Sequence, residues 1–244
     1  MIDQIRAELL KIRSTRTTLG LVAAMVALIV LFALLTGLVT EAPHLAAAED
    51  QRGLLNAGSI AGIFSALAGV MLITSEYRHG TIRPTLLFNP RRSHLLAAKA
   101  IASLLAGTVL GIVGESLGFG LGYLILAVRG IPFALTAGQA ALMTGGGLAA
   151  VALWGAIGAA VGAIVRNQVG AIIGLLAWGL IVDSLLFAFV PSVGRFSPNR
   201  AENAIEGLTT KHLLPATAGG AVLIGWAAAL TIAGILATTR RDVT

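Results

Sequence analysis

The sequence contains no cysteine and few charged or aromatic residues. Charged side chains make up 11% of its 244 residues, and aromatic side chains make up 5%. Without cysteine, the chain has neither a disulfide framework nor thiol chemistry. Hydrophobic residues make up 57% of the chain, which is more than one soluble core of this length can bury. These proportions predict an integral membrane protein.

Nucleotide, metal and hydrolase motifs are also missing. No GxxxxGK[ST] loop precedes any of the lysines, so the chain has no phosphate loop for ATP. The histidines fall on both predicted sides of the membrane and lack the i,i+4 partner of a helical metal site. No GxSxG elbow is present. We therefore expect no catalytic residue, no metal site and no cofactor on this chain.

Six apolar runs lie between the few charged residues, and each is long enough to cross a hydrocarbon core of roughly 30 Å. They cover residues 19–39, 54–74, 95–128, 133–165, 169–190 and 218–239. The third and fourth runs exceed the length of one crossing, which predicts tilted or projecting helices. The sequence therefore predicts a single all-α transmembrane domain over residues 1–244 with six transmembrane helices.

Lysine and arginine are distributed unequally between the two sets of loops. Twelve lie on the side that includes both termini, and five lie on the other side. Because short loops rich in these residues stay in the cytoplasm during insertion, both termini and residues 75–94 are predicted to be cytoplasmic. Residues 191–217 then form an extracellular loop. The basic loops lack aromatic interleaving, so topology explains the net charge of +6 better than nucleic-acid binding does.

Two short segments outside the runs have helical patterns. In residues 1–16, Met1, Ile2, Ile5, Leu9 and Ile12 share one side, which predicts an amphipathic interfacial helix that contacts membrane lipids. A basic leader that only sets topology is the alternative. In the extracellular loop, Ser197 and Pro198 predict the start of a short helix that Gly207 ends. That helix is either a lid over the outer mouth or a surface connector.

Glycines and two acids stand out within the apolar runs. A ridge of small residues, which favours close helix packing, is formed by Gly107, Gly111, Gly114, Gly118 and Gly122. Glu115 and Asp183 lie deep in the third and fifth runs, where an ionisable group is costly. Three roles remain open for each acid: a structural carboxyl bonded across helices, a polar patch in a translocation path, or a proton-coupling site. We expect no basic residue in the same membrane layer.

The loop between the second and third runs has an unusual composition. Gly80 permits a turn, Thr81 can cap a helix, and residues 86–88 offer an apolar surface. This surface favours a docked partner over a solvated loop that only sets topology. The segment SEYRHGTIRPTLLFNPRRSHLLAAKA resembles the corresponding loop of the ABC-2 type permeases, which are membrane subunits of ATP-binding cassette exporters. The matching positions are Glu76, Arg78, Gly80, Thr81, Pro90, Arg91, Arg92 and Lys99.

The resemblance implies a permease subunit that works with a separate ABC ATPase and a second permease subunit, in a homodimer or heterodimer. ATP and Mg²⁺ would bind the partner ATPase. The loop would form a cytoplasmic coupling helix that contacts this ATPase, and Pro84 departs from the family pattern inside it. The contact residues would be Glu76, Arg78, Gly80, Thr81, Arg83, Leu86, Leu87, Phe88, Arg91 and Arg92. The protein would lie in the plasma (inner) membrane of a bacterium.

The expected function is export of a hydrophobic or amphiphilic substrate by alternating access. Two other functions share many of these sequence features. An ion-coupled secondary transporter would use Glu115 or Asp183, although the two halves of the chain show no clear internal repeat. A scaffold or immunity subunit would have the same architecture without transporting anything itself.

Overall fold

The computed structural model describes residues 2–81, 92–208 and 211–240, and over these ranges it contains helices and no strands. Six helical segments are long and apolar enough to cross a membrane. They are Arg16–Val39, Ala48–Arg78, Ser93–Val128, Ala137–Val165, Gln168–Phe189 and Ala216–Arg240. The predicted all-helical architecture with six candidate spans is confirmed, and the chain is a multi-pass membrane protein.

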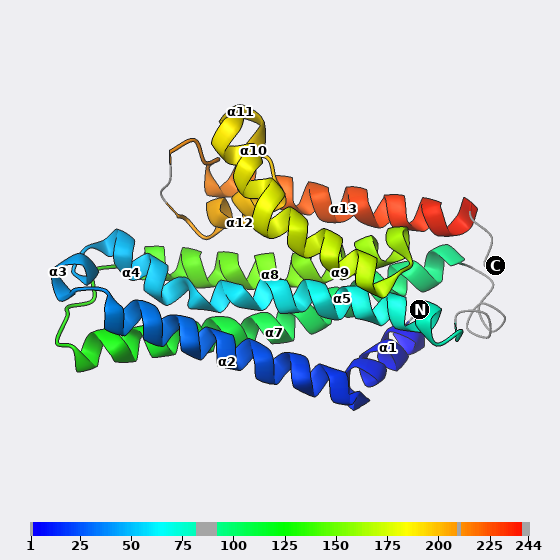
Figure 1. The fold of residues 1–244 in the computed structure, drawn as a ribbon, viewed down its shortest axis with the longest axis horizontal. Helices are drawn as coiled ribbons and strands as arrows, with labels where there is room; N and C mark the ends of the chain where they lie inside the picture. The colour runs from blue at the N-terminus through cyan, green and yellow to red at the C-terminus, as the bar shows by residue number, and fades with distance from the viewer. Residues whose placement is uncertain (1, 82–91, 209–210, 241–244) are drawn as a thin grey trace.

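The helices form an elongated bundle (Figure 1). In chain order they are α1 (Ile2–Ser14), α2 (Arg16–Val39), α3 (Ala42–Leu45), α4 (Ala48–Leu55), the 3₁₀ segment η1 (Asn56–Ile60), α5 (Ala61–Arg78), α7 (Arg92–Val128), α8 (Ala137–Val165), α9 (Gln168–Ala177), the π-helical segment η2 (Trp178–Val182), α10 (Asp183–Phe189), α11 (Pro191–Gly194), α12 (Pro198–Ile205) and α13 (Ala216–Arg240). Helix α1 and the last turn of α13 lie at the same end of the bundle (Figure 1). We call this the α1 end.

Helices α5, α7 and α8 form the centre of the bundle, and their glycines let the backbones approach closely. A methyl group added at Gly158 of α8 would collide with the carbonyl oxygen of Ala66 in α5. The predicted glycine ridge of α7 behaves in the same way: a methyl group at Gly118 would collide with the backbone of Gly58, and one at Gly107 would meet the carbonyl oxygen of Val151 at 2.9 Å. Backbone contact of this kind is how helices pack where no hydrophobic force drives them together.

Several helix boundaries differ from the predicted ones. The fourth span begins at Ala137 because Thr136 and Gln139 form a reciprocal capping box, so the predicted start at residue 133 is wrong. The second span begins before residue 54, because α4 continues through η1 into α5. The predicted coupling helix falls mainly on residues 82–91, which lie outside the described residues.

Two polar side chains, the buried Gln51 and the half-buried Arg129, hold together the end of the bundle opposite α1. The Gln51 amide donates to the carbonyl oxygens of Leu45 and Pro132 and accepts from the Ala134 nitrogen, all at 2.8–2.9 Å. Arg129 donates to the carbonyl oxygens of Gly37 and Thr40 at 2.6 and 2.7 Å. These bonds satisfy backbone groups that the helix ends leave open, so the loops at this end are fixed to the spans.

The short helix predicted in the long loop is present as α12. The Ser197 hydroxyl accepts a hydrogen bond from the Arg200 nitrogen at 3.4 Å, and Gly207 follows the helix with φ +72°. Pro198, Ala201 and Ala204 are buried. Helix α12 packs against α8 and α13, so it is part of the bundle and not a loosely attached surface connector.

The packing of α8 predicts opposite effects for two glycine-to-alanine changes in the same helix. Gly158→Ala should lower the free energy of unfolding by about 1–3 kcal/mol, because the methyl group overlaps α5. Gly145→Ala is the matched control: nothing lies within 4 Å of its added methyl group, and alanine favours the helix. Thermal unfolding in detergent measures both. Equal effects of the two changes would contradict this packing.

Candidate functional site

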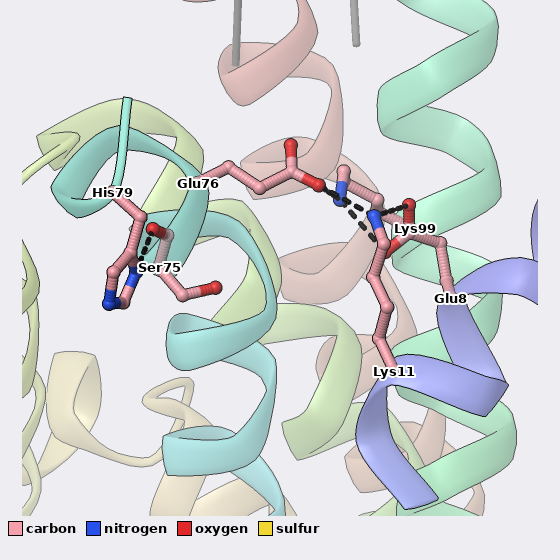
Figure 2. Close-up of polar contacts among 6 residues, drawn as sticks. All are labelled: Glu8, Lys11, Ser75, Glu76, His79 and Lys99. Atoms are coloured by element: carbon pink, nitrogen blue, oxygen red, sulfur yellow. Dashed lines mark hydrogen bonds and ion pairs between the residues drawn. The ribbon is translucent and has the colours of Figure 1, made fainter. Parts of the chain in front are cut away.

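Four charged side chains form an ion-pair network at the α1 end (Figure 2). Lys99 of α7 donates to Glu8 of α1 at 2.9 Å and to Glu76 of α5 at 2.8 Å. Lys11 of α1 donates to Glu8 at 3.0 Å and to Glu76 at 2.8 Å. Figure 2 shows Glu8 and Lys11 reaching from α1, and Glu76 from α5, toward the Lys99 ammonium group. The network therefore joins three helices.

Most of this network is shielded from solvent. The Lys99 side chain is 1% exposed, and the Glu8 and Glu76 side chains are 4% and 7% exposed. Two lysines and two glutamates sum to zero charge, which makes burial of the group tolerable. Removal of one partner from such a group leaves an uncompensated buried charge. The four side chains are therefore interdependent.

Lys11 closes the network toward solvent, because 48% of its side chain is exposed. Partial burial by itself would lower the pKa of Lys11. The hydrogen bonds and negative charges of Glu76 and Glu8 outweigh that effect and raise the pKa above its ordinary value. Lys11 therefore stays positively charged across the physiological pH range.

The residues predicted to contact an ATPase differ in their exposure to solvent, and several lie outside the described residues. Glu76 is directed into the network, whereas Arg78 and Gly80 are exposed at the end of α5. Gly80 has φ +68°, which confirms the predicted turn. Thr81 is exposed and is the last described residue before the gap. Arg83, Leu86, Leu87, Phe88 and Arg91 lie outside the described residues, and Arg92 begins α7.

Asp183, one of the two predicted intramembrane acids, has a basic partner. Its Oδ2 atom lies 3.2 Å from Nε of Arg200, and the Arg200 guanidinium stacks on Phe187 at 4.4 Å. The expectation that no basic residue lies near these acids is therefore wrong for Asp183. Sequence reasoning had assigned Arg200 to an extracellular loop, but α12 folds back onto the spans and brings Arg200 to α10.

The fold around Asp183 is irregular. Asp183 follows the π-helical segment η2 directly, and such segments occur frequently at functional sites. Asn199, next to Arg200 on α12, donates to the Gly179 carbonyl oxygen in η2 at 3.2 Å. Helix α12 thus holds the fifth span at two adjacent points.

Glu115, the other predicted acid, lies between α7 and α8. It is 5% exposed, and its carboxylate sits against Gly147. Neither oxygen accepts a hydrogen bond from the part of the chain that the structure describes. Glu115 also lines a groove of about 390 Å³ between α7 and α8, together with Ser116 and Thr144. No hydrogen bond or ion pair joins Glu115 to Asp183 among the described residues.

Two further acids that sequence reasoning missed belong to α12 and the residue after it. The Trp154 ring nitrogen donates to Glu202 at 2.9 Å, and Asn56 donates to Glu206 at 2.9 Å. Burial raises the pKa of Glu202 to about 7, although the bond from Trp154 opposes this rise. Burial also raises the pKa of Glu206 well above its ordinary value. Both acids belong to the predicted loop 191–217 and do not interrupt an apolar run, so the sequence gives no signal that they face the spans.

A small cavity adjoins Glu202. It has a volume of about 70 Å³ and lies between α5, α8, α12 and the fifth span. Glu202, Trp154 and Asn199 supply its polar wall, and Ile63 and Leu180 are among its apolar residues. This volume holds a few water-sized groups. In the described ranges, no group of three or more His, Asp or Glu side chains is arranged to hold a metal ion.

Comparison with known proteins gives no family assignment. No protein-family model matches the chain, and no curated protein matches it significantly.

The buried network predicts unequal roles for its two lysines. Lys99→Met should lower the free energy of unfolding by about 3–5 kcal/mol, because Glu8 and Glu76 then share only Lys11 and one buried negative charge is left uncompensated. Lys11→Met should cost much less, since Lys11 is half exposed. Thermal unfolding in detergent provides the measurement.

A triple variant separates charge from packing in this network. Glu8→Gln and Glu76→Gln, combined with Lys99→Met, remove the buried charges together and should restore much of the stability lost in Lys99→Met alone. If Lys99→Met lowers the free energy of unfolding no more than Lys11→Met does, the buried ion pairs of Lys99 do not stabilise the α1 end.

The acids of α12 predict that stability depends on pH. The pKa of Glu202 is about 7 in the folded protein and 4.5 as its ordinary value, so the folded state binds more protons than the unfolded state between these values. Stability should therefore fall as pH rises from about 4.5 to about 7. Glu202→Gln should reduce this slope, whereas Glu41→Gln, at an exposed position, should leave it unchanged. Melting temperatures between pH 4.5 and 8 test this, and an identical slope in Glu202→Gln would rule out the assignment.

Proposed function

We propose that this protein is the membrane subunit of an ATP-driven exporter, similar to the ABC-2 type permeases. It would work as a dimer with a second permease subunit and would be moved by a separate ATPase that binds ATP and Mg²⁺. Residues 75–94 would be the cytoplasmic coupling loop. The proposal rests on the loop sequence and on the six candidate spans.

The observation that supports this proposal most directly is the Lys99 network. Helix α5 leads into the coupling loop and α7 leads out of it, and Glu76 and Lys99 join these two flanks. Glu8 and Lys11 add the N-terminal helix to the same group. A displacement of the loop would then move α1, α5 and α7 together. This arrangement suits a subunit that receives its motion from outside.

Alternating access would follow from motion between this group and the rest of the bundle. The backbone contacts of α5, α7 and α8 leave little freedom inside the centre. The fifth span and α13 are less buried than α5, α7 and α8. We therefore assign to them a larger displacement than to these central helices. ATP binding would favour one arrangement only through differential affinity of the ATPase for the two states.

The substrate path would include the groove beside Glu115 and the cavity beside Glu202. Both combine a carboxylate with apolar walls. These walls suit a hydrophobic or amphiphilic substrate. The Asp183–Arg200 pair, 3.2 Å apart, would hold α12 against the fifth span near this path.

Transport in reconstituted vesicles tests the proposal. The chain should be co-reconstituted with an ATPase encoded in a neighbouring reading frame that contains GxxxxGK[ST]. We expect uptake of a hydrophobic dye to require ATP and to stop when the ATPase lysine of that motif is replaced. Uptake driven by an imposed proton gradient without the ATPase would instead identify an ion-coupled secondary transporter. Absence of both kinds of uptake with every amphiphile tested would favour the scaffold or immunity function.

The ATPase contact has its own test. The double variant Arg83→Glu and Arg91→Glu reverses two charges in the coupling loop and should reduce co-purification of the ATPase at least tenfold, by charge repulsion. Arg240→Glu is the matched control, because Arg240 is exposed at the end of α13, outside the loop. Equal co-purification of the loop variant and the wild type would contradict the assignment of this loop.

A further inference from the structure

A basic cavity lies next to the ion-pair network at the α1 end. Its volume is about 240 Å³, and residues of α1, α2, α5 and α9 line it. Its polar wall carries Lys11 and Arg78, and the hydroxyl groups of Thr15, Thr17 and Thr18. Ammonium, guanidinium and hydroxyl groups are all hydrogen-bond donors. Their combination favours an anionic ligand with several acceptor oxygens.

The excess positive charge of this cavity comes from Arg78. Lys11 is compensated within the network, because Glu8 and Glu76 face it and balance both Lys11 and Lys99. Arg78 is exposed, and its hydrogen bond to the Gln168 amide oxygen is long, at 3.4 Å. The guanidinium group therefore keeps donors for a ligand. An arginine in this situation suits a phosphate, which it can bind through two parallel bonds.

The start of α2 adds a second feature to the same wall. Thr15 precedes this 24-residue helix, but its side chain does not cap it. The Thr15 hydroxyl instead donates to the Ile12 carbonyl oxygen at 3.4 Å and lies 2.8 Å from the Thr18 hydroxyl. The N-terminus of a helix carries partial positive charge and offers backbone N–H groups to anions. Here that terminus lines the cavity that also contains Arg78.

The floor of the cavity is apolar. Leu21 of α2, with Met71 and Leu72 of α5, lines the side that continues into the candidate spans. A free phosphate ion would use only the polar wall. A phospholipid would use both parts, with its phosphate at the wall and its acyl chains along the floor.

We propose that this cavity binds the phosphate group of an anionic phospholipid at the α1 end of the bundle. Arg78 and the first turn of α2 hold the phosphate, and Lys11, which gives two of its three N–H groups to Glu8 and Glu76, adds its third. Leu21 and Met71 contact the upper part of an acyl chain. The bound lipid joins α1, α2 and α5 beside the Lys99 network. The inference concerns the isolated chain and does not depend on the proposed transport function.

Native mass spectrometry of the purified full chain in detergent tests this site. Three probes are titrated: dioctanoyl phosphatidylglycerol, dioctanoyl phosphatidylcholine and glycerol 3-phosphate. We expect phosphatidylglycerol to bind at least tenfold more tightly than phosphatidylcholine, which has the same chains but no net charge. Glycerol 3-phosphate should bind more weakly than phosphatidylglycerol, because it lacks the acyl chains. Equally tight binding of glycerol 3-phosphate would overturn the lipid assignment in favour of a soluble phosphate compound.

Matched variants locate the binding. Arg78→Gln should weaken the binding of phosphatidylglycerol about tenfold, because the uncharged glutamine amide can replace only one of the two parallel bonds of the guanidinium group. Arg6→Gln removes the same charge from an exposed position on α1 outside the cavity, and it should change the affinity less than twofold. If both variants weaken the binding of phosphatidylglycerol equally, the lipid is held by non-specific charge attraction and the assignment of this cavity is wrong.

A second variant keeps the test informative if Arg78→Gln does not fold. Thr17→Val replaces an exposed hydroxyl in the first turn of α2 and should weaken phosphatidylglycerol about threefold. Unchanged affinity in every cavity variant that folds would overturn the proposal.

Discussion

The buried Lys99 ammonium group is the constraint on which the α1 end of this molecule depends. It is 1% exposed and is bonded to one carboxylate from α1 and one from α5. Neither carboxylate could remain charged at that depth without a cation. The ion pairs therefore help fix the position of α1, which also packs against α7, and they join it to both sides of the predicted coupling loop.

This constraint acts on a centre that is already rigid. Gly69, Gly155 and Gly158 bring the backbones of α5 and α8 into direct contact, and Gly107 and Gly118 do the same for α7. Packed backbones of this kind switch between discrete arrangements rather than deform continuously. Motion at the loop would consequently be passed on as a displacement of whole helices. The basic cavity beside Lys11 places a lipid contact at the same junction.

The sequence predicts the fold better than the site. Apolar runs predict the six spans because length and hydrophobicity alone determine them, and the Thr136 cap shifts one boundary by a few residues. The capping signal at Ser197 correctly predicts α12. Its packing could not be predicted, since the return of α12 onto α8 and α10 depends on long-range contacts. For that reason no local pattern pairs Arg200 with Asp183, or places Glu202 against Trp154 and Glu206 against Asn56.

Lys99 and Glu76 illustrate the same limit. Both belong to the loop pattern that resembles the ABC-2 permeases, but no local signal pairs them with Glu8, which is 91 residues from Lys99.

Hydrogen–deuterium exchange tests the central claim directly, with wild type compared with Lys99→Met. The account predicts at least tenfold faster exchange for the amides of α1 in the variant and unchanged exchange for the centre of α8. Unchanged exchange in α1 would contradict it.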